Sequence, residues 1–111
     1  MTFKTLSVVI PCFNEENTLE ALVGHVLAAE RCDLGLEIII IDDKSQDRSL
    51  EKAQGLSDAH AEIKLVRHDV NQGKGAAMRT GFENATGDIV IVQDADLEYD
   101  PGEYPKLLAP I

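Results

Sequence analysis

The chain has 111 residues, of which 44% are hydrophobic, and this predicts one globular domain rather than a disordered segment. Its 20 acidic and 10 basic residues give a formal net charge of −10. Such an acidic chain repels nucleic-acid phosphate, so we expect no nucleic-acid partner. Its two cysteines, Cys12 and Cys32, are too few for a disulfide framework and favour a reducing, cytoplasmic setting. We expect neither a signal peptide nor a transmembrane helix in this sequence.

The amino-terminal part begins with a strand and a helix. Residues 6–10 are rich in β-branched side chains and predict a strand that is stopped by Pro11. Residues 17–29 carry apolar side chains at helical spacing and predict an amphipathic helix. Asn17 and Glu20 have the spacing of a capping box at the start of this helix.

The middle of the chain repeats the alternation. Residues 37–41 predict a strand, and its apolar run at residues 38–41 shows no alternation, as expected for a strand covered on both faces. A polar loop follows at residues 42–45, and Asp47 is placed to cap a helix that runs to about Leu56. Residues 63–66 predict a third strand.

The last part begins with a glycine-rich turn at residues 71–75. The helix predicted after it has one apolar face, formed by Met78, Gly81, Phe82 and Ala85. Gly87 is predicted to end this helix, residues 88–93 predict a fourth strand, and Pro101 is suited to start a further helix.

Alternating strands and helices predict an α/β fold with three layers, α/β/α, around a mostly parallel, Rossmann-like sheet. Ligands of such sheets bind at the carboxyl ends of the strands. Three polar segments follow predicted strands, at residues 11–16, 42–45 and 94–98. We therefore expect the functional site where these segments meet.

The segment Asp94-Ala95-Asp96-Leu97-Glu98 follows the fourth predicted strand directly. Residues two apart in an extended chain point to the same side, so its three carboxylates can converge. Carboxylates so placed favour a divalent cation, and Mg²⁺ or Mn²⁺ would also accept diphosphate oxygens as ligands. The alternative is a solvated acidic loop that caps the next helix.

Two other segments offer groups for a nucleoside. Asp42 and Asp43 could accept hydrogen bonds from a base and a ribose, although Asp42 could instead stabilise a turn. Phe13, after Pro11, offers a face for stacking on a base, and Glu15 could reach a ribose. The alternative places Phe13 in the core and Glu15 at the start of a helix.

Gly73-Lys74-Gly75 could bring backbone N–H groups and the cation of Lys74 near a phosphate. The segment matches neither a Walker loop nor the dinucleotide-binding fingerprint. The three histidines lack metal-ligand spacing and are interpreted as surface or hydrogen-bonded residues: His25, His60 and His68.

Four segments in this order resemble the amino-terminal half of family 2 glycosyltransferases of the GT-A fold. They are residues 7–16, residues 40–47 with an Asp-Asp-x-Ser-x-Asp pattern, residues 71–77 with Asn-x-Gly-Lys-Gly, and residues 87–96 with the Asp-x-Asp (DXD) motif. Residues 94–101, with Pro105 and Leu107-Leu108 after them, are most similar to the polyprenyl-phosphate hexose transferases, such as dolichyl-phosphate mannose synthases.

The resemblance implies a metal-dependent enzyme that transfers a sugar from a UDP- or GDP-sugar to an acceptor, with a polyprenyl phosphate at the cytosolic face of the membrane as the expected acceptor. It places Asp43 on the base, Phe13 against it and Glu15 near the ribose. The implied nucleotide-binding set is Pro11, Phe13, Glu15, Asp42, Asp43, Lys74, Asp94 and Ala95, and the implied ligands of Mg²⁺ or Mn²⁺ are Asp94, Asp96 and Glu98. Lys44 departs from the family pattern, which commonly has glycine there.

Family catalytic domains are roughly twice as long as this chain on the usual scale of domain sizes. We therefore interpret residues 1–111 as the nucleotide-sugar-binding half of such a domain, with the catalytic base outside it. The last parallel strand would then be an exposed edge, which predicts self-association. Two alternatives remain: a nucleotide- and metal-binding half-domain without catalysis, and a haloacid-dehalogenase-type phosphatase, whose motif expects Thr or Val where this chain has Glu98.

Overall fold

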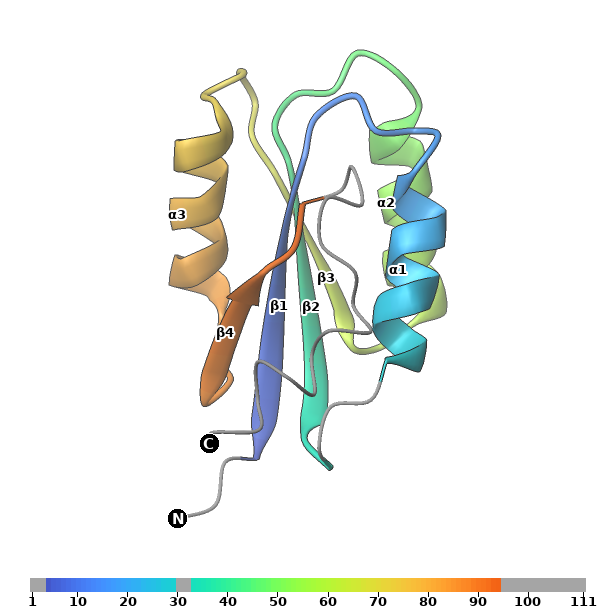
Figure 1. The fold of residues 1–111 in the computed structure, drawn as a ribbon. Coiled ribbons are helices and arrows are strands. Elements are labelled where there is room, and N and C mark those ends of the chain that lie inside the picture. The colour runs from blue at the N-terminus through green and yellow to red at the C-terminus, as the bar shows by residue number, and fades with distance from the viewer. Residues whose placement is uncertain (1–3, 30–32, 95–111) are drawn as a thin grey trace.

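The computed structural model describes residues 4–29 and 33–94, which form a parallel sheet with helices on both faces (Figure 1). In chain order the elements are β1 (Thr5–Cys12), α1 (Leu19–Ala28), β2 (Gly35–Asp42), α2 (Ser49–Ala59), β3 (Ile63–Arg67), α3 (Lys74–Asn84) and β4 (Ile89–Val92). The strand order is β3-β2-β1-β4, and every pairing in it is parallel. The predicted three-layer α/β fold is therefore confirmed.

The two central strands are apolar on both faces because each face is covered by helices. On the side of α1 and α2, Ile38 and Ile40 of β2 pack in one fully buried cluster with Leu22 of α1. On the side of α3, Ile39 and Ile41 pack with Val9 and Ala77, which are also buried. This two-sided burial explains why residues 38–41 show no polar alternation.

Two predicted boundaries in the first half of the chain were wrong. β1 continues through Pro11 to Cys12, because β4 pairs with β1 only as far as Val9. Among the described strands, Pro11 therefore has only β2 as a neighbour, a place where proline is tolerated. The capping box also does not form. α1 begins at Leu19, and Thr18 at its N-cap makes no side-chain capping hydrogen bond.

The start of α2 agrees better with the prediction. Asp47 Oδ1 accepts a hydrogen bond of 2.8 Å from the backbone N–H of Ser49, the first residue of the helix. The helix runs to Ala59, one turn further than expected. Asp47 thus satisfies one of the free N–H groups of the helix terminus.

The predicted apolar face of α3 was only partly right. Gly81 is buried against the sheet, and a Cβ atom there would lie 2.2 Å from Val9 Cγ1. Phe82, in contrast, is 49% exposed. Gly87 does not end the helix, which stops at Asn84. Gly87 instead lies so close to β1 that a Cβ atom on it would be 2.5 Å from Ser7 Oγ. Tight packing thus accounts for both glycines.

β4 forms one edge of the described sheet, as expected for the last parallel strand, and Val90 on it is 40% exposed. Self-association through this edge stays a prediction. The helix predicted after Pro101 lies outside the described residues. None of the three described helices has the length and hydropathy that crossing a bilayer requires.

Candidate functional site

The carboxyl ends of β1, β2 and β4 surround a cavity of about 300 Å³. Its lining residues are Pro11, Cys12, Phe13, Glu15, Asp43, Asn71, Gly73, Lys74, Ala77 and Asp94. Most of the predicted nucleotide-binding residues are therefore brought together at one place. Of the others, Asp42 is not among the lining residues, and Ala95 lies outside the described residues.

Asp43 is the most connected side chain of this cavity. Its Oδ1 lies 2.8 Å from His68 Nδ1 and accepts from the N–H of Gln72 at 2.9 Å. Its Oδ2 accepts from the N–H of Gly73 at 2.8 Å. Burial acts to raise the pKa of Asp43, but the hydrogen bonds from His68, Gln72 and Gly73 outweigh it and hold the pKa below its ordinary value. Asp43 thus holds the glycine turn, and its contact with a base stays a prediction.

Sequence reasoning missed two partners of Asp43. His68 is almost fully buried, and its Nε2 lies 2.8 Å from Thr80 Oγ1 of α3. The side-chain amide of Asn71 donates to the backbone carbonyl of Asp43 at 3.0 Å. His68 was expected to be exposed or hydrogen-bonded, and it is hydrogen-bonded. Nothing in the local sequence signals its pairing with a carboxylate 25 positions away.

Lys74 and Asp94 form an ion pair at the cavity. Lys74 Nζ lies 2.7 Å from one carboxylate oxygen of Asp94 and 2.8 Å from the other. The lysine side chain is 58% exposed and the aspartate 12% exposed, so the pair is solvated on the lysine side. Lys74 is also the first residue of α3, whose amino-terminal N–H groups favour a bound anion. This corner of the cavity is suited to bind a phosphate and a cation.

Asp42, the last residue of β2, shares a strand face with Ile38 and Ile40, which pack on the side of α1 and α2, whereas the partners of Asp43 lie beside α3. Asp42 Oδ2 accepts from the N–H of Ser45 at 3.1 Å, as the turn alternative predicted. Its Oδ1 is buried and has no hydrogen-bond partner among the described residues. The position of Asp42 therefore favours a structural role in the turn over contact with a nucleotide.

Phe13 and Cys12 form part of the cavity wall after β1. Phe13 is 43% exposed and lines the cavity, which contradicts its placement in the core. Cys12 is a buried free thiol. Burial raises the pKa of Cys12 to about 12, with a hydrogen bond from Ser49 acting in the opposite direction. The thiol therefore stays neutral at physiological pH.

Of the predicted metal ligands, only Asp94 lies within the described residues, and Asp96 and Glu98 lie outside them. Within residues 4–29 and 33–94, no group of three or more His, Cys, Asp or Glu side chains could hold a metal ion. Asp94 presents a carboxylate to the cavity, the type of ligand that a hard cation prefers, and the ammonium of Lys74 occupies that carboxylate in this structure.

The chain matches a known protein family over most of its length. The sequence model for glycosyl transferase family 2 matches residues 7–111. The chain belongs to this family. The match covers all four segments on which the resemblance rests, and it favours the transferase interpretation over the phosphatase alternative.

Curated relatives connect the chain to lipid-phosphate transferases. It is 41% identical over 106 residues to a dolichol-phosphate mannosyltransferase of Pyrococcus furiosus, and the match covers 96% of this chain and 30% of the relative. It is 44% identical over 108 residues to an undecaprenyl-phosphate 4-deoxy-4-formamido-L-arabinose transferase of Pectobacterium carotovorum, which covers 95% of this chain and 33% of the relative. The chain thus spans about one third of the length of these relatives.

A solved structure supports the GT-A fold. The mannosyltransferase PcManGT from Pyrobaculum calidifontis, in complex with GDP-Man and Mn²⁺, matches with a TM-score of 0.73 and 25% identity. The match covers 86% of this chain and 28% of that protein. The described sheet and helices are therefore the α/β part of a GT-A glycosyltransferase fold.

Proposed function

We propose that this chain is the nucleotide-sugar-binding part of a metal-dependent glycosyltransferase that uses a UDP- or GDP-sugar as donor and a polyprenyl phosphate as acceptor. One observation carries the proposal. The cavity joins the exposed ring of Phe13 and the carboxylate of Glu15 to the Lys74–Asp94 pair, so one hollow holds groups for both parts of a nucleoside diphosphate. Both relatives described above are named as transferases that act on polyprenyl phosphates.

The residues of the cavity divide the donor between them. The ring of Phe13 stacks on the base, and Glu15 accepts from a ribose hydroxyl. Lys74 and the amino terminus of α3 bind the diphosphate, which requires Lys74 to leave Asp94.

The carboxylate of Asp94 then becomes available to a divalent cation, together with Asp96 and Glu98. Bound there, Mg²⁺ or Mn²⁺ would neutralise the charge that develops on the departing nucleoside diphosphate. The structurally similar mannosyltransferase PcManGT was solved with Mn²⁺, which supports a divalent metal at this site. We place the reaction at the cytosolic face of a membrane, where a polyprenyl phosphate is accessible.

The donor site can be tested by thermal unfolding of the chain with UDP, GDP, CDP and ADP, each with and without Mn²⁺. A ligand at about 100 times its dissociation constant stabilises by roughly 2.7 kcal/mol, which raises Tm by on the order of 10 °C in a domain of this size. We expect one diphosphate to stabilise the chain only with Mn²⁺, and Asp94→Asn to abolish the shift.

Glu51→Gln is the matched control. It also removes a carboxylate from an ion pair, but this pair is 68% exposed on both sides, and neither partner lines the cavity. If no diphosphate stabilises the chain under any of these conditions, the donor site proposed here is absent from it. Transfer of radiolabelled sugar by the chain alone would separate a catalytic unit from a half-domain that binds without catalysis.

A further inference from the structure

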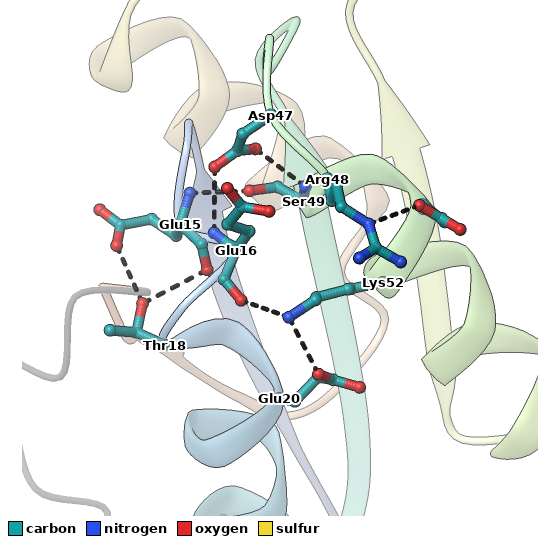
Figure 2. A network of polar contacts seen from close by, with 9 residues as sticks. Glu15, Glu16, Thr18, Glu20, Asp47, Arg48, Ser49 and Lys52 are labelled. Atoms are coloured by element: carbon teal, nitrogen blue, oxygen red, sulfur yellow. Dashed lines mark hydrogen bonds and ion pairs between the residues drawn. The ribbon is translucent and has the colours of Figure 1, made fainter.

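Side chains at the start of α2 hold the backbone of the loop that follows β1. Three successive amides of this loop each donate to a different side chain. The N–H of Asn14 donates to Ser45 Oγ at 3.0 Å, that of Glu15 to Ser49 Oγ at 2.7 Å, and that of Glu16 to Asp47 Oδ2 at 3.1 Å. Figure 2 shows the contacts of Glu15 and Glu16. We call residues 45–49 the clasp.

The two segments are also bound in the opposite direction. The side chain of Asn14 accepts from the N–H of Gln46 at 2.8 Å, and Asn14 itself has a φ of 55°, a conformation that asparagine tolerates. Lys52 of α2 donates to the carbonyl of Glu16 at 2.8 Å and lies 3.3 Å from the carboxylate of Glu20 (Figure 2). The loop therefore has a fixed conformation although it contains no strand or helix.

Asp47 uses both of its carboxylate oxygens, one to hold the loop and one to hold the start of α2. Oδ2 accepts from Glu16, and Oδ1 accepts from the backbone of Ser49, whose own hydroxyl accepts from Glu15 (Figure 2). Both Asp47 oxygens must therefore be acceptors. Asparagine has the same size but one acceptor and one N–H₂ donor, so Asp47→Asn sets a donor against one of the two amides.

The fixed loop determines where Glu15 stands. Its backbone is held by Ser49, which is completely buried, and its side chain accepts from Thr18 Oγ1 at 2.9 Å. Glu15 lines the cavity, whereas Asp47 and Ser49 do not. The clasp therefore affects the cavity indirectly, through Glu15, which can contact a ligand.

We propose that Asp47 and Ser49 are positioning residues that hold Glu15 against the ribose of the bound nucleotide and so set the preference for ribonucleotides over 2′-deoxyribonucleotides. This inference rests on the proposed function, because it requires a nucleoside diphosphate in the cavity. A hydrogen bond to a ribose hydroxyl discriminates only while its acceptor is held in place, since a displaced carboxylate loses the contact while stacking and phosphate contacts remain.

The test compares dissociation constants for UDP and 2′-deoxy-UDP, and for GDP and 2′-deoxy-GDP, measured by calorimetry with Mn²⁺. The ratio of the two constants is the decisive readout, because partial unfolding lowers the fraction of binding sites and leaves this ratio unchanged. We expect the wild-type chain to prefer the ribonucleotide by about tenfold, the usual effect of one hydrogen bond to a charged group. Asp47→Asn and Ser49→Ala should each reduce that preference severalfold, as should Glu15→Gln.

Two further variants make the result specific. Glu51→Gln, one turn further along α2, breaks only the exposed pair with Arg48 and should leave the ratio unchanged. In the Glu15→Gln background, Asp47→Asn should reduce the ratio no further, because both changes remove the same contact.

The outcomes separate the two proposals. If the wild-type chain binds none of the four diphosphates, the proposed function fails. If it binds ribo- and deoxyribonucleotides equally, or if Asp47→Asn leaves a tenfold preference intact, the clasp does not position Glu15 and the inference is overturned while the proposed function stands. An equal further loss in the Glu15→Gln background would also overturn it.

Discussion

Two buried carboxylates, one near each end of the central strand β2, organise the molecule in similar ways. Glu37 lies near the start of the strand and Asp43 directly after its end. Their side chains are 10% and 4% exposed. Hydrogen bonds hold both pKa values below their ordinary range against the effect of burial. By chemistry alone, either residue could mark a functional site.

The difference lies in what the hydrogen-bond donors do. Glu37 accepts hydrogen bonds from Ser7 of β1, Lys64 of β3 and Thr86 after α3, at distances from 2.6 to 2.9 Å. None of these residues lines the cavity. Asp43 accepts hydrogen bonds from the backbone amides of the turn that leads to Lys74, and Asp43 itself lines the cavity. A buried, well-satisfied carboxylate therefore indicates a binding site only where its partners present groups to a ligand.

The largest expected effect comes from removing the charge of each carboxylate in turn. Glu37→Gln and Asp43→Asn should each lower the free energy of unfolding by on the order of 3 kcal/mol, because each leaves donors without a charged acceptor. Asp43→Asn should in addition weaken diphosphate binding, since the turn that carries Lys74 loosens. Urea unfolding and calorimetry measure the two quantities. Equal loss of affinity in both variants would contradict the division of roles.

The pH dependence of stability sharpens the same comparison. The pKa of Glu37 is lowered from 4.5 to about 2. Because the folded state binds the proton less readily than the unfolded state, the contribution of Glu37 is complete above pH 4.5 and is lost as the pH falls toward 2. The contribution amounts to roughly 2–3 kcal/mol.

Urea unfolding of wild type and Glu37→Gln at pH 7, 4 and 2.5 measures this contribution. The difference in unfolding free energy should be largest at pH 7 and small at pH 2.5. Asp43, Asp47 and Asp88 also have lowered pKa values, so the stability of both wild type and Glu37→Gln should fall in acid. A difference that is constant over this range would show that Glu37 does not titrate with folding.

The sequence predicted the arrangement of the sheet better than it predicted where the helices and strands begin and end. Uninterrupted apolar runs such as residues 38–41 determine strands covered on both faces, and the parallel order follows from the helices between them. The predicted boundaries at Pro11, Asn17 and Gly87 were wrong because tertiary contacts decide them. Pro11 is tolerated by the short pairing of β4, and Gly87 by its contact with Ser7.

The candidate site was predicted where a residue lines the cavity directly, as for Phe13 and Lys74. It was missed where a residue acts on another one. His68 reaches Asp43 across 25 positions, and Asp47 reaches Glu16 across 31. No local pattern encodes such pairs. The placement of Asp42 away from the cavity could have been foreseen, because adjacent residues of a strand face opposite sides.

A smaller effect is expected at Lys74, which separates binding from folding. Lys74→Met should weaken diphosphate binding about tenfold, as expected for loss of a charge-assisted contact. It should change the free energy of unfolding by less than about 1 kcal/mol, because the pair with Asp94 is largely solvated on the lysine side. Calorimetry and urea unfolding measure both.

Arg48→Met is the matched control for this variant. It also removes an exposed cation from an ion pair, in this case with Glu51, but Arg48 does not line the cavity. It should leave affinity unchanged. Should Lys74→Met bind diphosphates as tightly as wild type, Lys74 would have no role in the proposed site.

The smallest effect is expected at Lys44, which follows Asp43 and has a φ of 63°. A lysine in this left-handed conformation is strained by about 1 kcal/mol, whereas glycine adopts it freely but loses more entropy on folding. Lys44→Gly should therefore stabilise the chain by about 0.5 kcal/mol in urea unfolding, with the clasp and the contacts of Asp43 intact. Lys44→Gln removes the same charge but keeps a long side chain that is strained in this conformation, so its stability should stay close to that of wild type. If Gln stabilised as much as Gly, the gain would come from the lost charge rather than from the backbone.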